Sequence, residues 1–218
     1  MSPVLLTADE SPLDHACAAA SLYGCDIPLL NYLLQDLRVL MRRAAYGDIT
    51  IEPHQNFEWD VHGLKRHTIV CDPERLKAPF DVNIVGFVGD RRQETAGSAS
   101  VDEVEAALHQ EFRRYPGILS YSSAELVDDQ WIDLVVHTDP EDREAWRESD
   151  VHAHAVAQLA PMMYHSVRIH NGCVPGGPVG SESVIIENTK YWDYDTAPVW
   201  HAFRELPRGA KGSVSEVG

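Results

Sequence analysis

The tract W-R-E-S-D-V-H-A-H, residues 146–154, brings one indole and two imidazoles close together in the chain. The surrounding pattern predicts a helix, in which His152 shares the apolar stripe of Val156 and Leu159 while His154 points about 200° away. An imidazole titrates near neutrality, so His152 facing a sheet can serve as a general base or as a ligand. The alternative is a partly buried histidine whose ring is satisfied by a backbone carbonyl.

The H-x-H spacing of His152 and His154 suits a metal site on a strand, where both rings point the same way. On a helix the two rings diverge, so we discount a metal site here. Trp146 has two open interpretations, since it can roof a ligand cavity or belong to the ordinary core of an amphipathic helix. Asn83, on a predicted strand, can donate a hydrogen bond to a substrate carbonyl or to dioxygen, or be satisfied by neighbouring backbone.

Two predicted strands carry a polar face and an aliphatic face. In 131–137 and 163–170 the polar faces hold Trp131, Asp133, Val135, His137, Tyr164, Ser166, Arg168 and His170. The aliphatic faces hold Ile132, Leu134, Val136, Val167 and Ile169. We expect the aliphatic faces to pack under helices and the polar faces to point into the space between two paired sheets. These polar groups then belong to a site, or to a wet dimer interface with Asp133 paired to Arg168.

The elements that position these residues follow a β-α-β-β-α-β order between about 79 and 172. Strands are predicted at 82–88, 118–126, 131–137 and 163–170 from β-branched runs and turn residues. A capping box at Ser100 and Glu103 begins the first helix, and Asp139-Pro140 begins the second, which is bent near Ser149 and ends near 159. Asn171-Gly172 closes the unit. The predicted class is α+β, with a ferredoxin-like βαββαβ core.

The flanking segments are less regular. Residues 1–78 form an N-terminal extension with one amphipathic helix, Leu29–Met41, which begins after Pro28 and stops before Gly47. Residues 48–78 read as a linker with marginal strands at 49–51 and 67–70. Residues 173–218 form a C-terminal extension with a possible strand at 183–187, an aromatic cluster and a frayed tail. The cluster comprises Tyr191, Trp192, Tyr194, Trp200 and Phe203. We expect both extensions to pack near or over the cavity of the core, because leaving them exposed favours aggregation.

The βαββαβ order together with W-R-E-S-D-V-H-A-H resembles the dimeric α+β barrel superfamily, in particular its antibiotic-biosynthesis-monooxygenase-like group, over residues 79–172. This resemblance implies a homodimer whose sheets face one another, with a cavity between sheet and helices in each subunit. It also implies either a cofactor-independent monooxygenase, isomerase or cyclase, or a haem-binding enzyme. The haem-ligating histidine of such enzymes corresponds to Val156 here, so His152, one turn earlier, is the displaced candidate.

Composition narrows the partners. The net charge is -16, with 34 acidic and 18 basic residues, and no local basic stripe offsets it, so nucleic acid is excluded as an expected partner. The four cysteines contain no C-x-x-C pair, which predicts reduced thiols in a cytoplasm and no zinc site. The sequence shows neither an export segment nor an apolar run of about 18 residues, so we expect no membrane association.

The leading functional prediction is a small-molecule enzyme of the monooxygenase, isomerase or cyclase type. Its substrate is a small apolar, aromatic or polyketide-like molecule, and it needs no cofactor. The predicted catalytic residues are His152, Asn83, Trp146, His137, Asp133, Arg168, His170 and Tyr164. Two alternatives remain open, a haem protein with His152 as axial ligand and a non-catalytic ligand-binding module.

Overall fold

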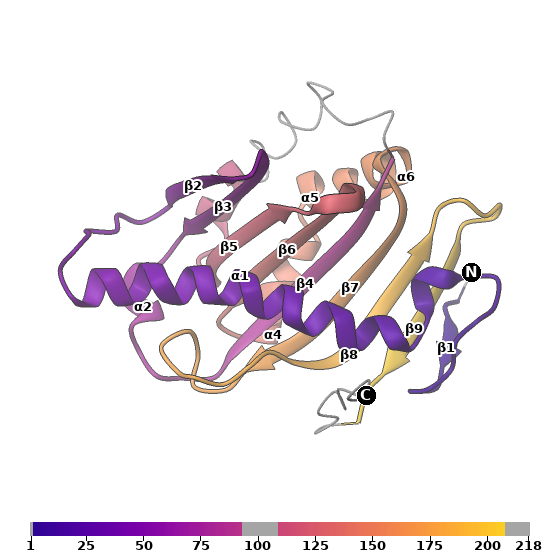
Figure 1. The fold of residues 1–218 in the computed structure, drawn as a ribbon, viewed down its shortest axis with the longest axis horizontal. Coiled ribbons are helices and arrows are strands. Elements are labelled where there is room, and N and C mark those ends of the chain that lie inside the picture. The colour runs from indigo at the N-terminus through magenta and orange to yellow at the C-terminus, as the bar shows by residue number, and fades with distance from the viewer. Residues whose placement is uncertain (1, 93–108, 208–218) are drawn as a thin grey trace.

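The computed structural model describes residues 2–92 and 109–207. Over these ranges the chain forms one sheet with helices on both faces (Figure 1). The strands are β1 (Val4–Leu6), β2 (Gln55–Val61), β3 (Leu64–Val70), β4 (Val82–Arg91), β5 (Ile118–Glu125), β6 (Gln130–His137), β7 (Tyr164–Val174), β8 (Ile185–Asp193) and β9 (Trp200–Glu205). The helices are α1 (Ser21–Ala45), α2 (Pro73–Leu76), α4 (Pro140–Arg147), α5 (Asp150–His154) and α6 (Ala160–Met163), with a π-helical turn at Ala155–Leu159 between the last two.

The strands are arranged in the order β1-β9-β8-β7-β4-β6-β5-β3-β2. Each neighbouring pair is antiparallel except β1 and β9, which are parallel. The four strands predicted between 79 and 172 lie side by side as β7-β4-β6-β5. Strands from both flanking segments extend this group on either side, which confirms the α+β class and places all of the strands in a single sheet.

The second predicted helix begins as expected, because the Asp139 side chain accepts a hydrogen bond from the Asp142 N–H and Pro140 occupies the first turn. The chain then breaks at Ser149, whose extended backbone (φ -64°, ψ 144°) separates α4 from α5. The Ser149 hydroxyl caps α5 by accepting from the His152 N–H at 3.1 Å. The predicted bend is therefore a second helix start, and it fixes where the His152 side chain lies.

Helix 29–41 and strand 67–70 are found, within α1 and β3, but three predicted boundaries are wrong. Residues 48–78 contain a β-hairpin, β2 and β3, that joins the sheet beside β5, and its turn uses His62 and Gly63 with positive φ. The N-terminal helix begins at Ser21 and carries Pro28 inside it, because its first turns are held against the sheet and not by local propensity. Strand β7 continues through Asn171-Gly172 to Val174.

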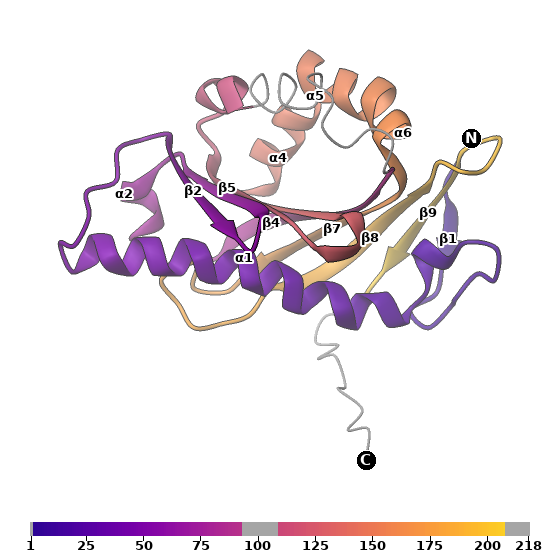
Figure 2. The ribbon, with the colours of Figure 1, turned by 45° about the horizontal axis from the view of Figure 1, so that its top comes forward.

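Helix α1 lies across one face of the sheet, and α4–α6 lie on the other (Figure 2). The leucine stripe of α1 is buried together with the aliphatic side chains of β4 and β6. The stripe consists of Leu30, Leu33, Leu34, Leu37 and Leu40, each 0–1% exposed. Helix and sheet approach so closely that a Cβ on Gly86 would stand 2.5 Å from the Leu30 side chain. Each buried leucine stabilises the fold by about 1.5–3 kcal/mol.

This packing corrects the predicted faces. Ile132, Leu134 and Val136 do lie under a helix, but that helix is α1. The opposite face of β6, with Asp133, is covered by α4–α6 and not by a partner's sheet. Helices of the same chain thus cover both faces of β6, and the Asp133 face, on which the predicted sheet-to-sheet dimer relies, is not free for such packing. Homodimer formation stays a prediction.

The first helix of the predicted unit falls largely outside the described residues, since Ser100, Glu103 and residues 101–108 are not described. Among the helices that are described, none is both long and apolar enough to cross a membrane.

We expect Leu37→Ala to lower the free energy of unfolding by about 2–5 kcal/mol, because it leaves a cavity between α1 and the sheet. Val39→Ala on the same helix, at a side chain that is 41% exposed, should change it by less than about 0.5 kcal/mol. Urea denaturation followed by circular dichroism measures both. Equal losses in the two variants would contradict the seating of α1 on the sheet.

Candidate functional site

A cavity lies between the sheet and α4–α6 and consists of two adjoining chambers. The inner chamber, about 180 Å³, is walled mainly by apolar and aromatic side chains, among them Val85, Phe87 and Tyr164. The outer chamber, about 360 Å³, includes Arg143, Arg147 and Lys190. The two chambers share Val85, Trp146, His152, Val156 and Ile169. An apolar pocket with a few converging polar groups is the usual form of a small-molecule site.

His152 stands where the two chambers meet. Its ring packs edge-on against Trp146, with ring centroids 4.6 Å apart. Burial lowers the pKa of His152, while a hydrogen bond with the Arg147 main chain opposes that fall. If one ring nitrogen of His152 donates to the main-chain carbonyl of Arg147, the other nitrogen of the neutral ring is an acceptor. The structure thus places a neutral imidazole with one basic nitrogen beside the cavity.

Trp146 is 7% exposed and packs between two histidines. The centroid of its ring lies 4.6 Å from that of His152 and 6.0 Å from that of His137. Trp146 lines both chambers. Both interpretations of this residue therefore hold, because it belongs to the core and also bounds the cavity.

His137 is fully buried behind Trp146, and it does not line either chamber. Within residues 2–92 and 109–207 neither of its ring nitrogens has a hydrogen-bond partner, and the same holds for the Trp146 indole nitrogen. Burial, reinforced by Arg143, lowers the pKa of His137 to about 3. It is therefore a neutral wall residue, set back from the space that a ligand can fill.

Asp133 closes the inner chamber with a satisfied carboxylate. Its Oδ1 accepts from the Tyr121 hydroxyl at 3.0 Å and from the Trp131 indole N–H at 2.8 Å. Behind Tyr121 lie His67 and His109, whose pKa values are lowered to about 4 by burial. These neutral rings add no charge near pH 7, which leaves Asp133 as the carboxylate in the wall of the inner chamber.

Tyr164 also faces the inner chamber, in edge-to-face contact with Phe87 at 5.2 Å. It reaches this face because the pairing of β4 and β7 shifts register between Asp90 and Arg91. Close packing accompanies the shift, since a Cβ on Gly89 would stand 2.4 Å from the Tyr164 ring. Simple alternation had grouped Tyr164 with Arg168 and His170, and the bulge separates them.

Arg168 and His170 lie on the opposite face of the sheet, so the predicted pair of Asp133 and Arg168 does not form. Phe87 of β4 is opposite both Asp133 and Ile169, whereas Val88 is opposite Arg168. Residues that are opposite in a sheet share a face, so Asp133 and Ile169 point into the cavity and Arg168 points toward α1. The eight predicted catalytic residues thus do not share one site. Arg168 and His170 lie on the α1 side of the sheet, and the other six lie on the side of α4–α6.

Arg168 and His170 instead bind Asp26 of α1, which the sequence analysis did not single out. The carboxylate of Asp26 accepts from Arg168 at 2.6 and 2.8 Å and from His170 Nε2 at 3.0 Å. His170 Nδ1 lies 2.9 Å from the Thr189 hydroxyl. Asp26 is 1% exposed, and burial would raise its pKa, but hydrogen bonds from His170 and Arg168 outweigh that effect and lower it. The group is a buried anchor for α1.

Asn83 is satisfied by neighbouring backbone, the second of its two predicted roles. It pairs with His137 on β6, and its amide donates to the Thr138 carbonyl at 3.4 Å. It lies outside the residues that line the two chambers. The cysteines are free, and burial raises the pKa of Cys17 to about 11 and of Cys71 to about 12, which disfavours thiolate chemistry at these two.

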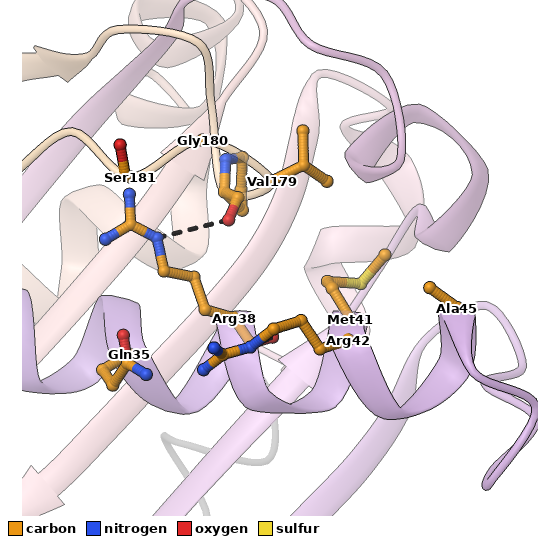
Figure 3. Close-up of a pocket in the computed structure, with 9 residues that line it drawn as sticks. Gln35, Arg38, Met41, Arg42, Ala45, Val179, Gly180 and Ser181 are labelled. Atoms are coloured by element: carbon orange, nitrogen blue, oxygen red, sulfur yellow. Dashed lines mark hydrogen bonds between the residues drawn. The ribbon is translucent and has the colours of Figure 1, made fainter.

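A second hollow, a groove of about 540 Å³, lies between α1 and residues 178–181 (Figure 3). Arg38 crosses it and donates to the Pro178 carbonyl at 3.2 Å and to the Glu182 carbonyl at 2.6 Å. Its donors are thus used to hold the loop against α1. We favour the cavity under α4–α6 as the site, because it combines a neutral base with apolar walls.

The site residues missed by sequence reasoning are mainly cationic. Arg143 and Arg147 are four residues apart on α4, a spacing that places them on one helix face. Lys190 lies opposite Ile169 in the pairing of β7 and β8. The spacing of Arg143 and Arg147 was visible in the sequence. The approach of Lys190 to α4 depends on the pairing of β8, in the C-terminal extension, with β7. No group of three or more potential metal ligands occurs in the part of the chain that the structure describes.

Comparisons with known proteins give little further evidence. No family model matches the chain, and no curated protein matches it. Among solved structures, a protein from Shewanella oneidensis, SO0527, is similar at 14% identity with a TM-score of 0.37. The similarity covers 44% of this chain and 91% of that one. A likeness this weak bears on neither family nor function.

We expect Asp26→Ala to cost about 3–5 kcal/mol of unfolding free energy, because it leaves the Arg168 charge buried without its carboxylate. Asp195 is a matched control, since it also binds an arginine and a histidine, at 2.6 Å to Arg92 and 2.8 Å to His165, but its side chain is 52% exposed. Asp195→Ala should cost at most about 1 kcal/mol.

The Asp26 contribution should also depend on pH. Its pKa is lowered in the folded protein, so its stabilisation is present above the unfolded-state value of about 3.9 and is lost as the pH falls through the folded value. Denaturant titrations should therefore show that the difference in unfolding free energy between wild type and D26A becomes smaller in acid. A gap that widened below that pH would contradict the assignment.

Proposed function

We propose that this chain is a small-molecule enzyme of the cofactor-independent monooxygenase, isomerase or cyclase type, with its site in the cavity under α4–α6. The observation that carries the proposal is the position of His152, a neutral imidazole where the two chambers meet, with one ring nitrogen engaged by the Arg147 main chain. Aromatic or polyketide-like substrates suit the apolar walls. The order β7-β4-β6-β5 supports the proposed kinship with the dimeric α+β barrel superfamily, with α1 in place of the partner's sheet.

The proposed chemistry is proton abstraction from an acidic carbon. The free His152 nitrogen takes the proton, and the electron pair stays on the substrate, delocalised into its carbonyl or ring system. An isomerase returns the proton to another carbon. A cyclase lets the carbanion attack a carbonyl carbon of the same molecule, and the alkoxide that forms takes the proton. In a monooxygenase the carbanion adds to dioxygen from solution, and the peroxide takes the proton and loses water, which leaves a carbonyl on the substrate. The base is already neutral because burial lowers its pKa, so it can accept a proton at pH 7.

Of the other predicted residues, Trp146, Asp133 and Tyr164 are proposed to shape the cavity. Asp133 accepts two hydrogen bonds from the protein through one carboxylate oxygen. It can therefore orient a donor group of the substrate more readily than it can serve as a second base. His137, Asn83, Arg168 and His170 are assigned no contact with substrate in this proposal.

Haem binding is a second candidate, favoured by one observation. His152 and Val156, where the resembling haem enzymes carry their ligand, both line the two chambers. His152 would be the residue that holds the iron, which when bound would supply oxidative chemistry. A Soret band in the purified protein separates this candidate from the first. A non-catalytic ligand-binding module would bind its ligand equally well without His152 and accelerate no reaction.

We expect the protein to accelerate deuterium incorporation into the acidic positions of anthrone or benzoylacetone in heavy water, measured by proton NMR. His152→Gln should slow that exchange by about 10²- to 10⁴-fold, the usual contribution of a general base, while leaving binding of the probe in place. His154→Gln is the control, because His154 is exposed on the same helix. Equal exchange rates in the two variants would contradict the role of His152.

A further inference from the structure

The outer chamber carries a concentration of positive charge that the proposed reaction does not use. Arg143 and Arg147 come from α4, and Lys190 comes from β8 on the facing sheet. The chain as a whole has a net charge of -16, so three cations lining one chamber run against its overall charge. The overall composition therefore does not explain why positive charge collects in the outer chamber.

The neighbouring carboxylate accounts for only part of it. Glu144 accepts from Arg143 Nε at 3.1 Å and from Arg147 Nη1 at 2.8 Å. In the described ranges, 2–92 and 109–207, the side chain of Lys190 has neither an ion pair nor a hydrogen bond. Burial lowers the pKa of Lys190, and Arg147 and Arg143 lower it further, against the opposing effect of Glu144. A half-buried ammonium repelled by two guanidinium groups is stabilised when an anion arrives.

The two chambers then impose a direction on a ligand. The outer chamber is cationic, the inner one is apolar, and His152 lies on the wall of both. A molecule with an anionic end and a ring system would place its charge beside Lys190 and its ring against Val85 and Phe87. The atoms between the two ends would then pass His152.

We propose that the substrate class is a ring-bearing organic carboxylate, with its anionic group bound by Lys190, aided by Arg143 and Arg147, and its ring held in the inner chamber. This inference deepens the proposed function, since it rests on the same cavity. Lys190 is a binding and specificity residue here, because it lines the outer chamber and not the inner chamber that takes the ring. The anion also substitutes for water around a desolvated cation, a gain that a neutral ligand cannot supply.

The test compares acids with amides of the same shape. Benzoate, naphthoate and anthracene carboxylate are titrated against their carboxamides, and the dissociation constants are measured by calorimetry at low salt. We expect at least one acid to bind the wild type about tenfold more tightly than its amide. Raising the salt from about 50 to about 500 mM should shrink that preference, since mobile ions screen the charges.

Variants of Lys190 test whether the preference for the acid over its amide comes from the outer chamber. Lys190→Met and Lys190→Gln should each weaken the acid about tenfold and leave the amide unchanged, with folding checked by circular dichroism. Lys65→Met, at an exposed lysine of β3, is the control and should change neither. Glu144→Gln should tighten acid binding several-fold, because it frees the two arginines from their shared carboxylate.

The outcomes separate this inference from the proposed function. Equal binding of every acid and its amide, no binding by any of them, or a preference unchanged in both Lys190 variants, would each overturn the carboxylate assignment. The dependence of deuterium exchange on His152 would stand in those cases. If instead the acid preference depended on Lys190 while exchange did not depend on His152, the anion site would stand and the proposed catalytic role would fall.

Discussion

The sheet of this protein has two largely apolar faces, and the rest of the structure depends on how the second one is covered. Helix α1 covers it with five leucines that are essentially without solvent exposure. Because this face is filled by the chain itself, the other face is left to α4–α6, and the cavity forms there. The site therefore owes its position to a helix that does not touch it.

The leucine stripe and the buried network of Asp26 contribute differently to the seating of α1. The leucines supply most of the favourable free energy, but an apolar stripe would tolerate a shift along the sheet. The carboxylate of Asp26 has its donors, Arg168 and His170, at one place only. A slip of one helical turn, about 5.4 Å, would leave these charges buried without partners, at a cost of several kcal/mol. The network thus fixes the register of the helix.

The cavity combines two physical requirements that usually conflict. Proton abstraction is favoured by a desolvated base, and burial keeps His152 neutral. Recognition of an anion is favoured by charge, which burial penalises. Here the two are separated, with the cations in the outer chamber and mainly apolar walls in the inner one. The break at Ser149 makes this possible, because it starts α5 afresh and sets His152 against Trp146, above the junction of the chambers.

The sequence by itself determined the local elements. Period-two runs located β4 to β7, Asp139-Pro140 located the start of α4, and the leucine spacing identified the apolar face of α1. It also singled out Trp146 and His152, each with a role at a cavity as one of two interpretations. The hairpin β2–β3 was also within its reach, since Phe57 and Trp59 alternate with polar residues before the turn at His62 and Gly63.

Only the tertiary structure decided which side of the sheet each face occupies. Alternation says that Asp133 and Ile132 lie on opposite faces, but relating the face of β6 to that of β7 requires the registers of both with β4. Those registers place Arg168 and His170 on the face of α1, and the shift near Arg91 moves Tyr164 to the other. Asp26 and Arg168 meet across 142 residues, and Lys190 meets α4 through a strand pairing. Periodicity is a property of neighbours in the chain, whereas pairing depends on the free energy of the whole sheet.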